Sequence, residues 1–287
     1  MPLTSLPTPP AFLTVRVELD DGDVHATTLC AGFERGAWRQ ADFVGYLFSY
    51  LLEFAFKWSV LGQINSATAS RMIEEAARKV YATPNFSKRG EFGELLLHAA
   101  LRNHFGSESA VAKIFYKSGD NDTVKGFDCV HVVENEDAEL ELWLGEAKFY
   151  ARAADAVRDA LISLASLIET ERLKREFAIV RGHVDDNWPY AAQFRALTEG
   201  KSLDEVFPIL CLPILLTYDS PAVGAAAAIT PEYQKALAAE VTTVFERLKA
   251  DPRLPREIHV HLILVPLKSK ETFLDALHER LLSYQAR

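Results

Sequence analysis

The chain has 287 residues, of which 49% are hydrophobic and 25% charged, and its formal net charge is −9. This length and composition are typical of a globular protein with one large domain or slightly more, and no stretch reaches the roughly 20 apolar residues of a membrane span. An acidic chain does not attract nucleic acid through its average field, so a nucleic-acid role requires a local basic patch, a metal ion or a partner.

The cysteines and the N-terminus indicate the compartment. Cys30, Cys129 and Cys211 are isolated and odd in number, which argues against a disulfide framework and against a zinc knuckle. Residues Met1–Pro10 lack the basic start and the long apolar core of a secretory signal. We therefore expect a cytoplasmic protein.

The first 85 residues are predicted to form an N-terminal α+β extension. Alternating apolar residues on both sides of a polar turn at 20–23 predict a β-hairpin over residues 11–30. Helical spacing then predicts two amphipathic helices, Gln40–Trp58 and Ala67–Tyr81. The break at Thr83-Pro84-Asn85 marks the predicted boundary with the rest of the chain.

Residues 86–287 alternate between helical and strand patterns. We expect a helix at 88–104, strands at 111–116, 127–133 and 140–150, a helix at 154–168, strands at 177–180 and 209–216, a helix at 232–249, a strand at 258–265 and a helix at 271–284. A polar turn at 118–122 and an acidic turn at 134–138 separate the three early strands. This order predicts the α/β (α+β) class, with a mixed sheet flanked by helices.

The strand at 140–150 carries an unusual pair of charges. Leu140, Leu142 and Leu144 share one face of what is predicted to be a half-buried strand, and Glu146 and Lys148 continue that row. A carboxylate and an ammonium on a core-facing row are costly unless they are paired, bind a metal ion or take part in chemistry. We interpret the pair as part of a hydrolytic metal site; the alternative is a salt bridge within a strand at a sheet edge.

Two further acids complete the predicted site. Asp128 lies on the preceding strand, which a short hairpin makes a neighbour of the Glu146 strand. The helix at 88–104 adds Glu94 or, alternatively, Glu91, because both lie on its polar face. We predict that Asp128, Glu146 and Glu94 hold Mg²⁺, or Mn²⁺ in its place, while Lys148 orients the nucleophile or stabilises the transition-state charge. The implied reaction is hydrolysis of a phosphodiester.

The order Glu94, Asp128, Glu146-Ala147-Lys148 resembles the motif of the PD-(D/E)xK nuclease superfamily. The segments 89–94, 126–131 and 142–150 are similar to HamA, the nuclease subunit of Hachiman anti-phage defence systems, and the similarity is densest over residues 86–165. This resemblance implies a restriction-endonuclease-like domain at 86–287 and a metal-dependent DNase. It also implies a HamB-like helicase partner that restrains the DNase until phage-associated DNA signals release it, with residues 1–85 helping to dock that partner.

A function other than a nuclease is also compatible with the sequence. A non-catalytic module that binds nucleic acid or regulates a helicase is the alternative, and it predicts binding that survives replacement of Glu146 or Lys148. RNA is the alternative substrate of a nuclease. The chain has neither a Gly-x-Ser-x-Gly elbow nor a full Walker-type phosphate loop, so we expect neither serine hydrolase nor ATPase activity.

Other polar residues are expected to lie outside the metal site. His131 is out of phase with Asp128 on its strand, so without a bulge we expect it on the opposite face, in a structural role or supporting a ligand rather than as a ligand itself. His259 and His261 are expected in the core or in an interface. Several cations flank the motifs, and we expect some of them to line the DNA path: Lys88, Arg89, Lys117, Lys125, Arg152 and Arg158.

Overall fold

The computed structural model describes residues 6–80, 90–112, 126–135 and 139–286 of the chain. Its strands are β1 (Thr14–Asp20), β2 (Val24–Cys30), β3 (Phe33–Glu34), β4 (Ala37–Trp38), β5 (Glu108–Ser109), β6 (Cys129–Glu134), β7 (Leu140–Phe149), β8 (Leu210–Asp219) and β9 (His259–Leu267). Its helices are α1 (Gln40–Phe48), α2 (Leu51–Ala55), α3 (Trp58–Leu61), α4 (Ala69–Val80), α5 (Glu91–His104), α6 (Ala153–Leu167), α7 (Thr170–His183), α8 (Ala191–Thr198), α9 (Leu203–Val206), the 3₁₀ helix η3 (Phe207–Ile209), α10 (Pro221–Ala225), α11 (Pro231–Lys249) and α12 (Lys270–Gln285).

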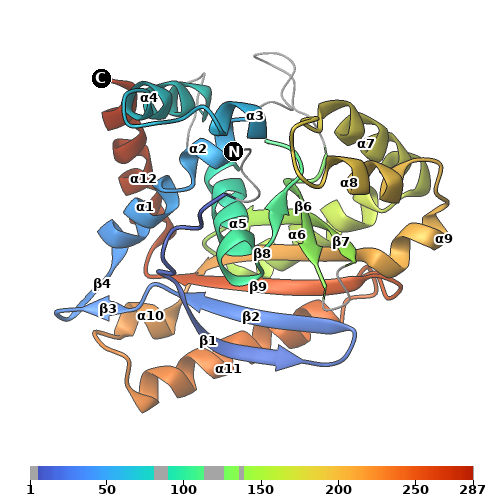
Figure 1. The fold of residues 1–287 in the computed structure, drawn as a ribbon. Helices are drawn as coiled ribbons and strands as arrows, with labels where there is room; N and C mark the ends of the chain where they lie inside the picture. The colour runs from blue at the N-terminus through green and yellow to red at the C-terminus, as the bar shows by residue number, and fades with distance from the viewer. Residues whose placement is uncertain (1–5, 81–89, 113–125, 136–138, 287) are drawn as a thin grey trace.

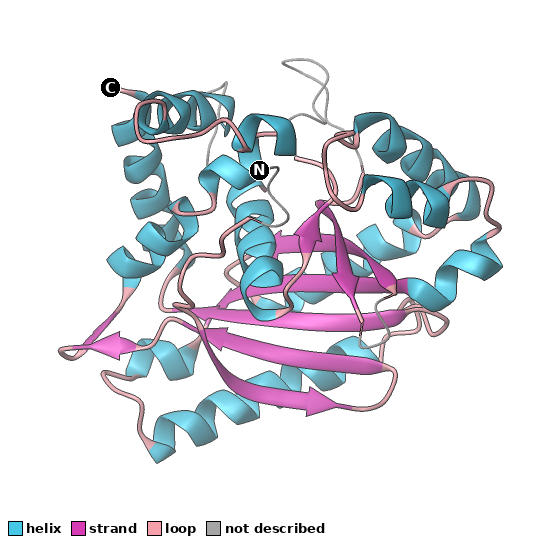
Figure 2. Ribbon diagram, viewed as in Figure 1, coloured by secondary structure: helices cyan, strands magenta, loops and turns pink. Residues whose placement is uncertain are grey.

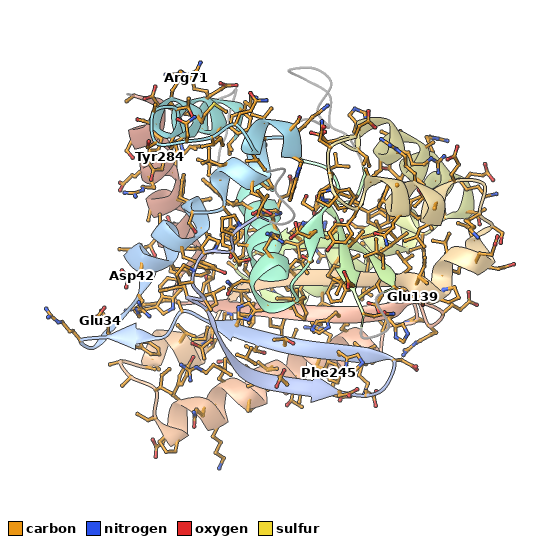
Figure 3. The ribbon with its side chains drawn as sticks, in the orientation of Figure 1. Glu34, Asp42, Arg71, Glu139, Phe245 and Tyr284 are labelled. Carbon is orange, nitrogen blue, oxygen red and sulfur yellow. The ribbon has the colours of Figure 1, made fainter. Side chains whose placement is uncertain are left out.

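In the part of the chain that is described, seven strands form one mixed sheet in the order β1-β2-β9-β8-β7-β6-β5. The inner strands β2, β9, β8 and β7 run parallel, whereas β1 and β6 are antiparallel to their inner neighbours. Strands β3 and β4 form a separate small ribbon at one end of the molecule (Figure 1). Glu34 in that ribbon and Glu139, just before β7, lie at opposite ends of the molecule in Figure 3.

Helices cover both faces of the sheet, which makes a three-layer arrangement (Figure 2). On one face α6 packs on β7 and β8, and α11 packs on β1, β2 and α6. On the other face α5 packs on β7, while α12 packs on β8 and on α1. Parallel strands covered on both faces are expected to be apolar throughout, and the runs Leu210–Leu216 and Leu262–Val265 are buried at every position.

The predicted mixed α/β sheet flanked by helices is confirmed. Most predicted elements lie within a few residues of the observed ones, because their apolar periods are long and their ends carry clear signals. The helix predicted at 232–249 is an example: Thr230 caps α11 by accepting from the Tyr233 N–H, and Pro231 occupies its first turn. Its buried residues Leu237, Val241 and Leu248 recur at helical spacing.

Three local predictions are wrong. The strand predicted at 177–180 lies within α7, since Leu173, Phe177 and Val180 are buried at helical spacing. The single helix predicted at 40–58 is divided into α1, α2 and α3, and the second break falls where Phe56 and Lys57 adopt extended conformations. The strand at 140–150 is not half-buried, because Leu142 and Trp143, which point to opposite faces of β7, are both buried.

The N-terminal hairpin belongs to the same sheet as the charged strand. It was predicted at 11–30, and its strand β2 pairs in parallel with β9 from Val24 opposite Val260 to Thr28 opposite Leu264. The boundary predicted at 85/86 lies outside the described residues, as do most of the strand predicted at 111–116, the turn at 118–122 and part of the turn at 134–138. The division into an extension and a nuclease domain stays a prediction. No helix among the described residues is long and apolar enough to cross a membrane.

Candidate active site

Asp128 and Glu146 are brought together by the pairing of β6 with β7. The two strands are antiparallel with Cys129 opposite Gly145, so Asp128 approaches β7 next to Glu146. The Asp128 N–H donates to the Gly145 carbonyl at 2.8 Å, and the Asp128 carboxylate accepts from the Ala147 N–H at 2.9 Å. These two hydrogen bonds hold the Asp128 carboxylate at the end of β7 that carries the charged row.

Glu146 and Lys148 form an ion pair that is largely removed from solvent. Glu146 is only 5% exposed, and its Oε1 lies 2.5 Å from Lys148 Nζ. Lys148 Nζ also donates to Ser163 Oγ of α6 at 2.9 Å. The salt bridge within the strand that the sequence offered as the alternative is therefore present, but its predicted place at a sheet edge is wrong, because β7 is flanked by β6 and β8.

The electrostatics of the site favour a cation. Burial and the negative charge of Asp128 raise the pKa of Glu146, while the Lys148 ammonium and the Ser163 hydroxyl oppose that rise. Asp128 and Glu146 are neighbouring carboxylates that repel each other, and among the described contacts the cation paired with Glu146 is Lys148. The site can therefore accept a further positive charge.

The donor set is suited to magnesium. Mg²⁺ is usually held by one or two carboxylates and keeps several waters or substrate oxygens, and Asp128 and Glu146 supply two carboxylates from adjacent strands. Among the residues that the structure describes, no three or more His, Cys, Asp or Glu side chains are grouped as a metal cage. The pair fits an ion that is held in part by water and substrate, and metal binding itself stays a prediction.

Glu94 and Glu91 come from the helix on the other face of β7. A Cβ on Gly93 of α5 would lie 3.5 Å from Ala147 Cβ and 3.3 Å from Phe149 Cβ, whereas Lys148 points to α6. Glu91 is buried and Glu94 is half-buried, both in the first turn of α5. The structure thus brings Asp128, Glu146 and Lys148 together, and the role of Glu94 or Glu91 stays a prediction.

Three polar residues beside the site were missed in the sequence. Ser163 and Asp159 lie one turn apart on α6; Ser163 contacts Lys148, and Asp159 accepts from the Tyr150 hydroxyl at 2.8 Å. Glu176 of α7 lies so close to Gly126 that a Cβ there would be 3.1 Å from its carboxyl carbon. The i, i+4 spacing of Asp159 and Ser163 was the only available signal, and it does not reveal which strand they meet.

His131 and His261 are held by hydrogen bonds to other side chains. His131 is fully buried on β6, where it hydrogen-bonds Ser107 Oγ at 2.8 Å and His98 Nδ1 at 3.1 Å. The structural role expected for His131 is therefore confirmed. His261 is half-buried and hydrogen-bonds Thr27 Oγ1 at 2.9 Å across the β2–β9 pair. His259 is exposed at the start of β9, so it does not lie in the core.

Two of the six cations expected on the DNA path are described. Arg152 is 78% exposed and pairs with Asp155 at 3.5 Å, and Arg158 is 55% exposed and pairs with Asp155 and Asp159. Arg152 lies just after β7, at its charged end, and Arg158 lies on α6. The other four lie outside the described residues: Lys88, Arg89, Lys117 and Lys125.

Comparison with known proteins identifies the family. No curated protein matches the chain. The model of the family described as HamA matches residues 10–281, which is nearly the whole chain and includes Asp128, Glu146 and Lys148. The chain belongs to the HamA family of Hachiman anti-phage defence proteins.

Proposed function

We propose that this protein is a metal-dependent DNA nuclease, the effector of a Hachiman-type defence system, and that a HamB-like helicase subunit restrains it. The observation that carries the proposal is the buried Glu146–Lys148 ion pair beside Asp128. A salt bridge with only a structural role needs one carboxylate to pair with the Lys148 ammonium. Here Glu146 already pairs with Lys148, and the Asp128 carboxylate lies beside it as a second one.

Each residue of the site has a separate role in the proposed hydrolysis of a phosphodiester. Asp128 and Glu146 would hold Mg²⁺, which when bound acidifies a water molecule and offsets charge on the phosphate. An ammonium has three N–H donors; Glu146 and Ser163 accept from Lys148, and a third donor is available to orient the attacking water or to stabilise charge on the phosphate. Glu94 is proposed to complete the site from α5.

The acidic net charge is compatible with this role. A chain with a net charge of −9 repels DNA at long range, so the isolated protein should find DNA slowly. A helicase partner that binds DNA itself would deliver the substrate directly to the site. The same dependence on a partner would limit damage to host DNA.

The test is a plasmid-cleavage assay on the isolated chain with Mg²⁺, with Mn²⁺ and with EDTA. We expect metal-dependent cutting that is lost in Lys148→Ala and in Glu146→Gln. The matched control is Lys174→Ala on α7, because Lys174 is 53% exposed and its nearest acid, Glu171, is 3.7 Å away. Cutting by Lys148→Ala at the wild-type rate would contradict the assignment of the site.

If the isolated chain is inactive, the assay is repeated with the helicase subunit and phage-derived DNA. Metal-dependent cutting only in that mixture supports a restrained enzyme. Binding of DNA or helicase that survives both substitutions, with no cutting under any condition, supports the non-catalytic alternative. An RNA substrate in a parallel reaction decides between the two nucleic acids.

A further inference from the structure

Ser163 is a residue of α6 whose side chain hydrogen-bonds the Glu146–Lys148 pair. Its Oγ accepts from Lys148 Nζ at 2.9 Å. Its hydroxyl also interacts with the Glu146 carboxylate. A serine hydroxyl has one donor and two acceptor positions, so the same group can accept from the ammonium and donate to the carboxylate.

The place of Ser163 in α6 is not explained by helix formation or by the core. The buried face of α6 is apolar and consists of Ala156, Val157, Ala160, Leu161, Leu164 and Leu167. Serine is a weaker helix former than alanine in a helix interior, and Ser163 is only partly buried. The described hydrogen bonds of its hydroxyl go to Lys148 and Glu146, so the site is the feature that accounts for a hydroxyl at this position.

The geometry limits the motion of Lys148. The lysine side chain is a flexible four-carbon stem with a rotatable ammonium. Glu146 lies on the same strand as Lys148, so their ion pair alone lets both side chains move together. Ser163 belongs to a different element, and its hydrogen bond fixes the ammonium relative to α6 as well as to β7. One turn earlier, Asp159 does the same for Tyr150, the next same-face residue after Lys148.

We propose that Ser163 is a positioning residue, which holds the Lys148 ammonium and the Glu146 carboxylate in the arrangement that hydrolysis requires. The proposal rests on the proposed nuclease function. Ser163 does not touch the reacting atoms; it acts through Lys148 and Glu146. A binding module with no chemistry would have no use for this restraint.

The kinetic test compares Ser163→Ala and Ser163→Thr with the wild type. Ser163→Ala should lower kcat by about tenfold or more, because a hydrogen bond to a charged group is lost, with little change in KM. Ser163→Thr keeps the hydroxyl and should restore most of kcat. The matched control is Ser166→Ala, since Ser166 lies three residues further along α6 and accepts from Arg172 rather than from the site. Thermal melting confirms that all three variants fold.

A second measurement does not depend on activity. The amines are labelled with N-hydroxysuccinimidyl acetate, and the rate at Lys148 is measured by peptide mass spectrometry. Lys148 should be labelled several-fold faster in Ser163→Ala and at the wild-type rate in Ser163→Thr and Ser166→Ala. The ester acylates the neutral amine and releases N-hydroxysuccinimide, and only the first variant removes the hydroxyl that restrains the Lys148 side chain. Unchanged labelling in Ser163→Ala overturns the proposal.

The two measurements separate failure of this proposal from failure of the proposed function. A wild type that cuts DNA, beside an inactive Lys148→Ala and a fully active Ser163→Ala, overturns only the role of Ser163. A wild type that never cuts, even with its helicase partner, overturns the proposed function and with it the catalytic role of Ser163. Faster labelling together with a lowered kcat in Ser163→Ala supports both.

Discussion

Glu91 and Glu94 occupy the first turn of α5, and their burial distinguishes them. Glu91 is 7% exposed, whereas Glu94 is half-buried and therefore more accessible to solvent. We predict that Glu94→Gln lowers metal-dependent cleavage by about 10- to 100-fold, as expected for an acid that supports a metal site through water. The measurement is the cleavage rate as a function of Mg²⁺ concentration.

Glu91→Gln is the control for that prediction. Both substitutions remove one negative charge from the same helical turn, so their effects on the helix dipole are alike. A larger loss of cleavage in Glu91→Gln than in Glu94→Gln would assign the helix acid to Glu91. Equal and small losses would show that neither acid belongs to the site.

His131 should make stability depend on pH. Burial lowers the pKa of His131 to about 3 in the folded protein, against 6.5 for an ordinary histidine. Below pH 6.5 the unfolded chain therefore binds a proton at this position that the folded chain does not. The stability that the neutral His131 provides is complete above pH 6.5 and is lost progressively as the pH falls towards 3.

The measurement is the free energy of unfolding of wild type and His131→Asn by urea titration at several pH values. We expect the wild type to be the more stable at neutral pH, because the variant loses hydrogen bonds to Ser107 and His98. The difference should shrink below pH 6.5 with a slope of about one proton per molecule. A difference that is constant with pH would mean that His131 has the same pKa in the folded and unfolded states.

The face to which a strand residue points could be predicted from the sequence where the alternation of side chains alone determines it. The shared face of Glu146 and Lys148 and the proximity of Asp128 follow from a period of two and a short connection. Ser163 was not predictable, since its contact with Lys148 depends on where α6 crosses β7, which the local pattern does not contain. Glu176 was missed because the adjacent residues 177–180 were predicted to be a strand, whereas they belong to α7.

At the level of elements, the close packing of α5 on β7 depends on Gly145. A Cβ at this position would lie 2.7 Å from Leu97 Cδ2 of α5 and closer still to Cys129 Sγ of β6. We predict that Gly145→Ala destabilises the protein by about 1–3 kcal/mol, because α5 or β6 must shift to make room. It should also lower cleavage, since Gly145 is the neighbour of Glu146 on β7 and faces α5, the helix that carries Glu94.

Gly182→Ala on α7 is the matched control for Gly145→Ala. No atom lies within 4 Å of a Cβ at Gly182, so alanine there should be neutral or should stabilise the helix by about 0.5–1 kcal/mol. Denaturant unfolding gives both values. A Gly145→Ala variant as stable as Gly182→Ala would show that α5 is free to move away from β7 without cost.

The errors among the predicted elements have a common cause. Phe177–Val180 is a short apolar run, and four residues do not distinguish a strand from a buried helical turn. The wider spacing of Leu173, Phe177 and Val180 is helical. The segment 40–58 keeps an apolar face throughout, so its pattern did not show that the chain changes direction at Phe56 and Lys57.

At the level of the whole molecule, one sheet joins the two segments that the sequence divides at residue 85. Strand β9 has β2 on one side and β8 on the other. Phe43 of α1 stacks on Phe273 of α12 with ring centroids 4.7 Å apart, so the core is shared as well. Parallel pairing between strands more than 200 residues apart cannot be inferred from local periodicity, because nothing in either strand specifies its neighbour.

A chain shortened to residues 86–287 should therefore fail to fold stably. Without β2, β9 would expose its backbone from Val260 to Leu264 as a bare edge, and Phe273 would lose its contact with Phe43. Loss of such buried aromatic packing typically costs about 3–5 kcal/mol, a large part of the total stability of a domain. The measurement is thermal unfolding by circular dichroism, with a chain that starts at residue 11 and keeps every strand of the sheet as the control. A cooperative transition in both chains would instead establish residues 1–85 as a separable extension, free to dock a partner without disturbing the site.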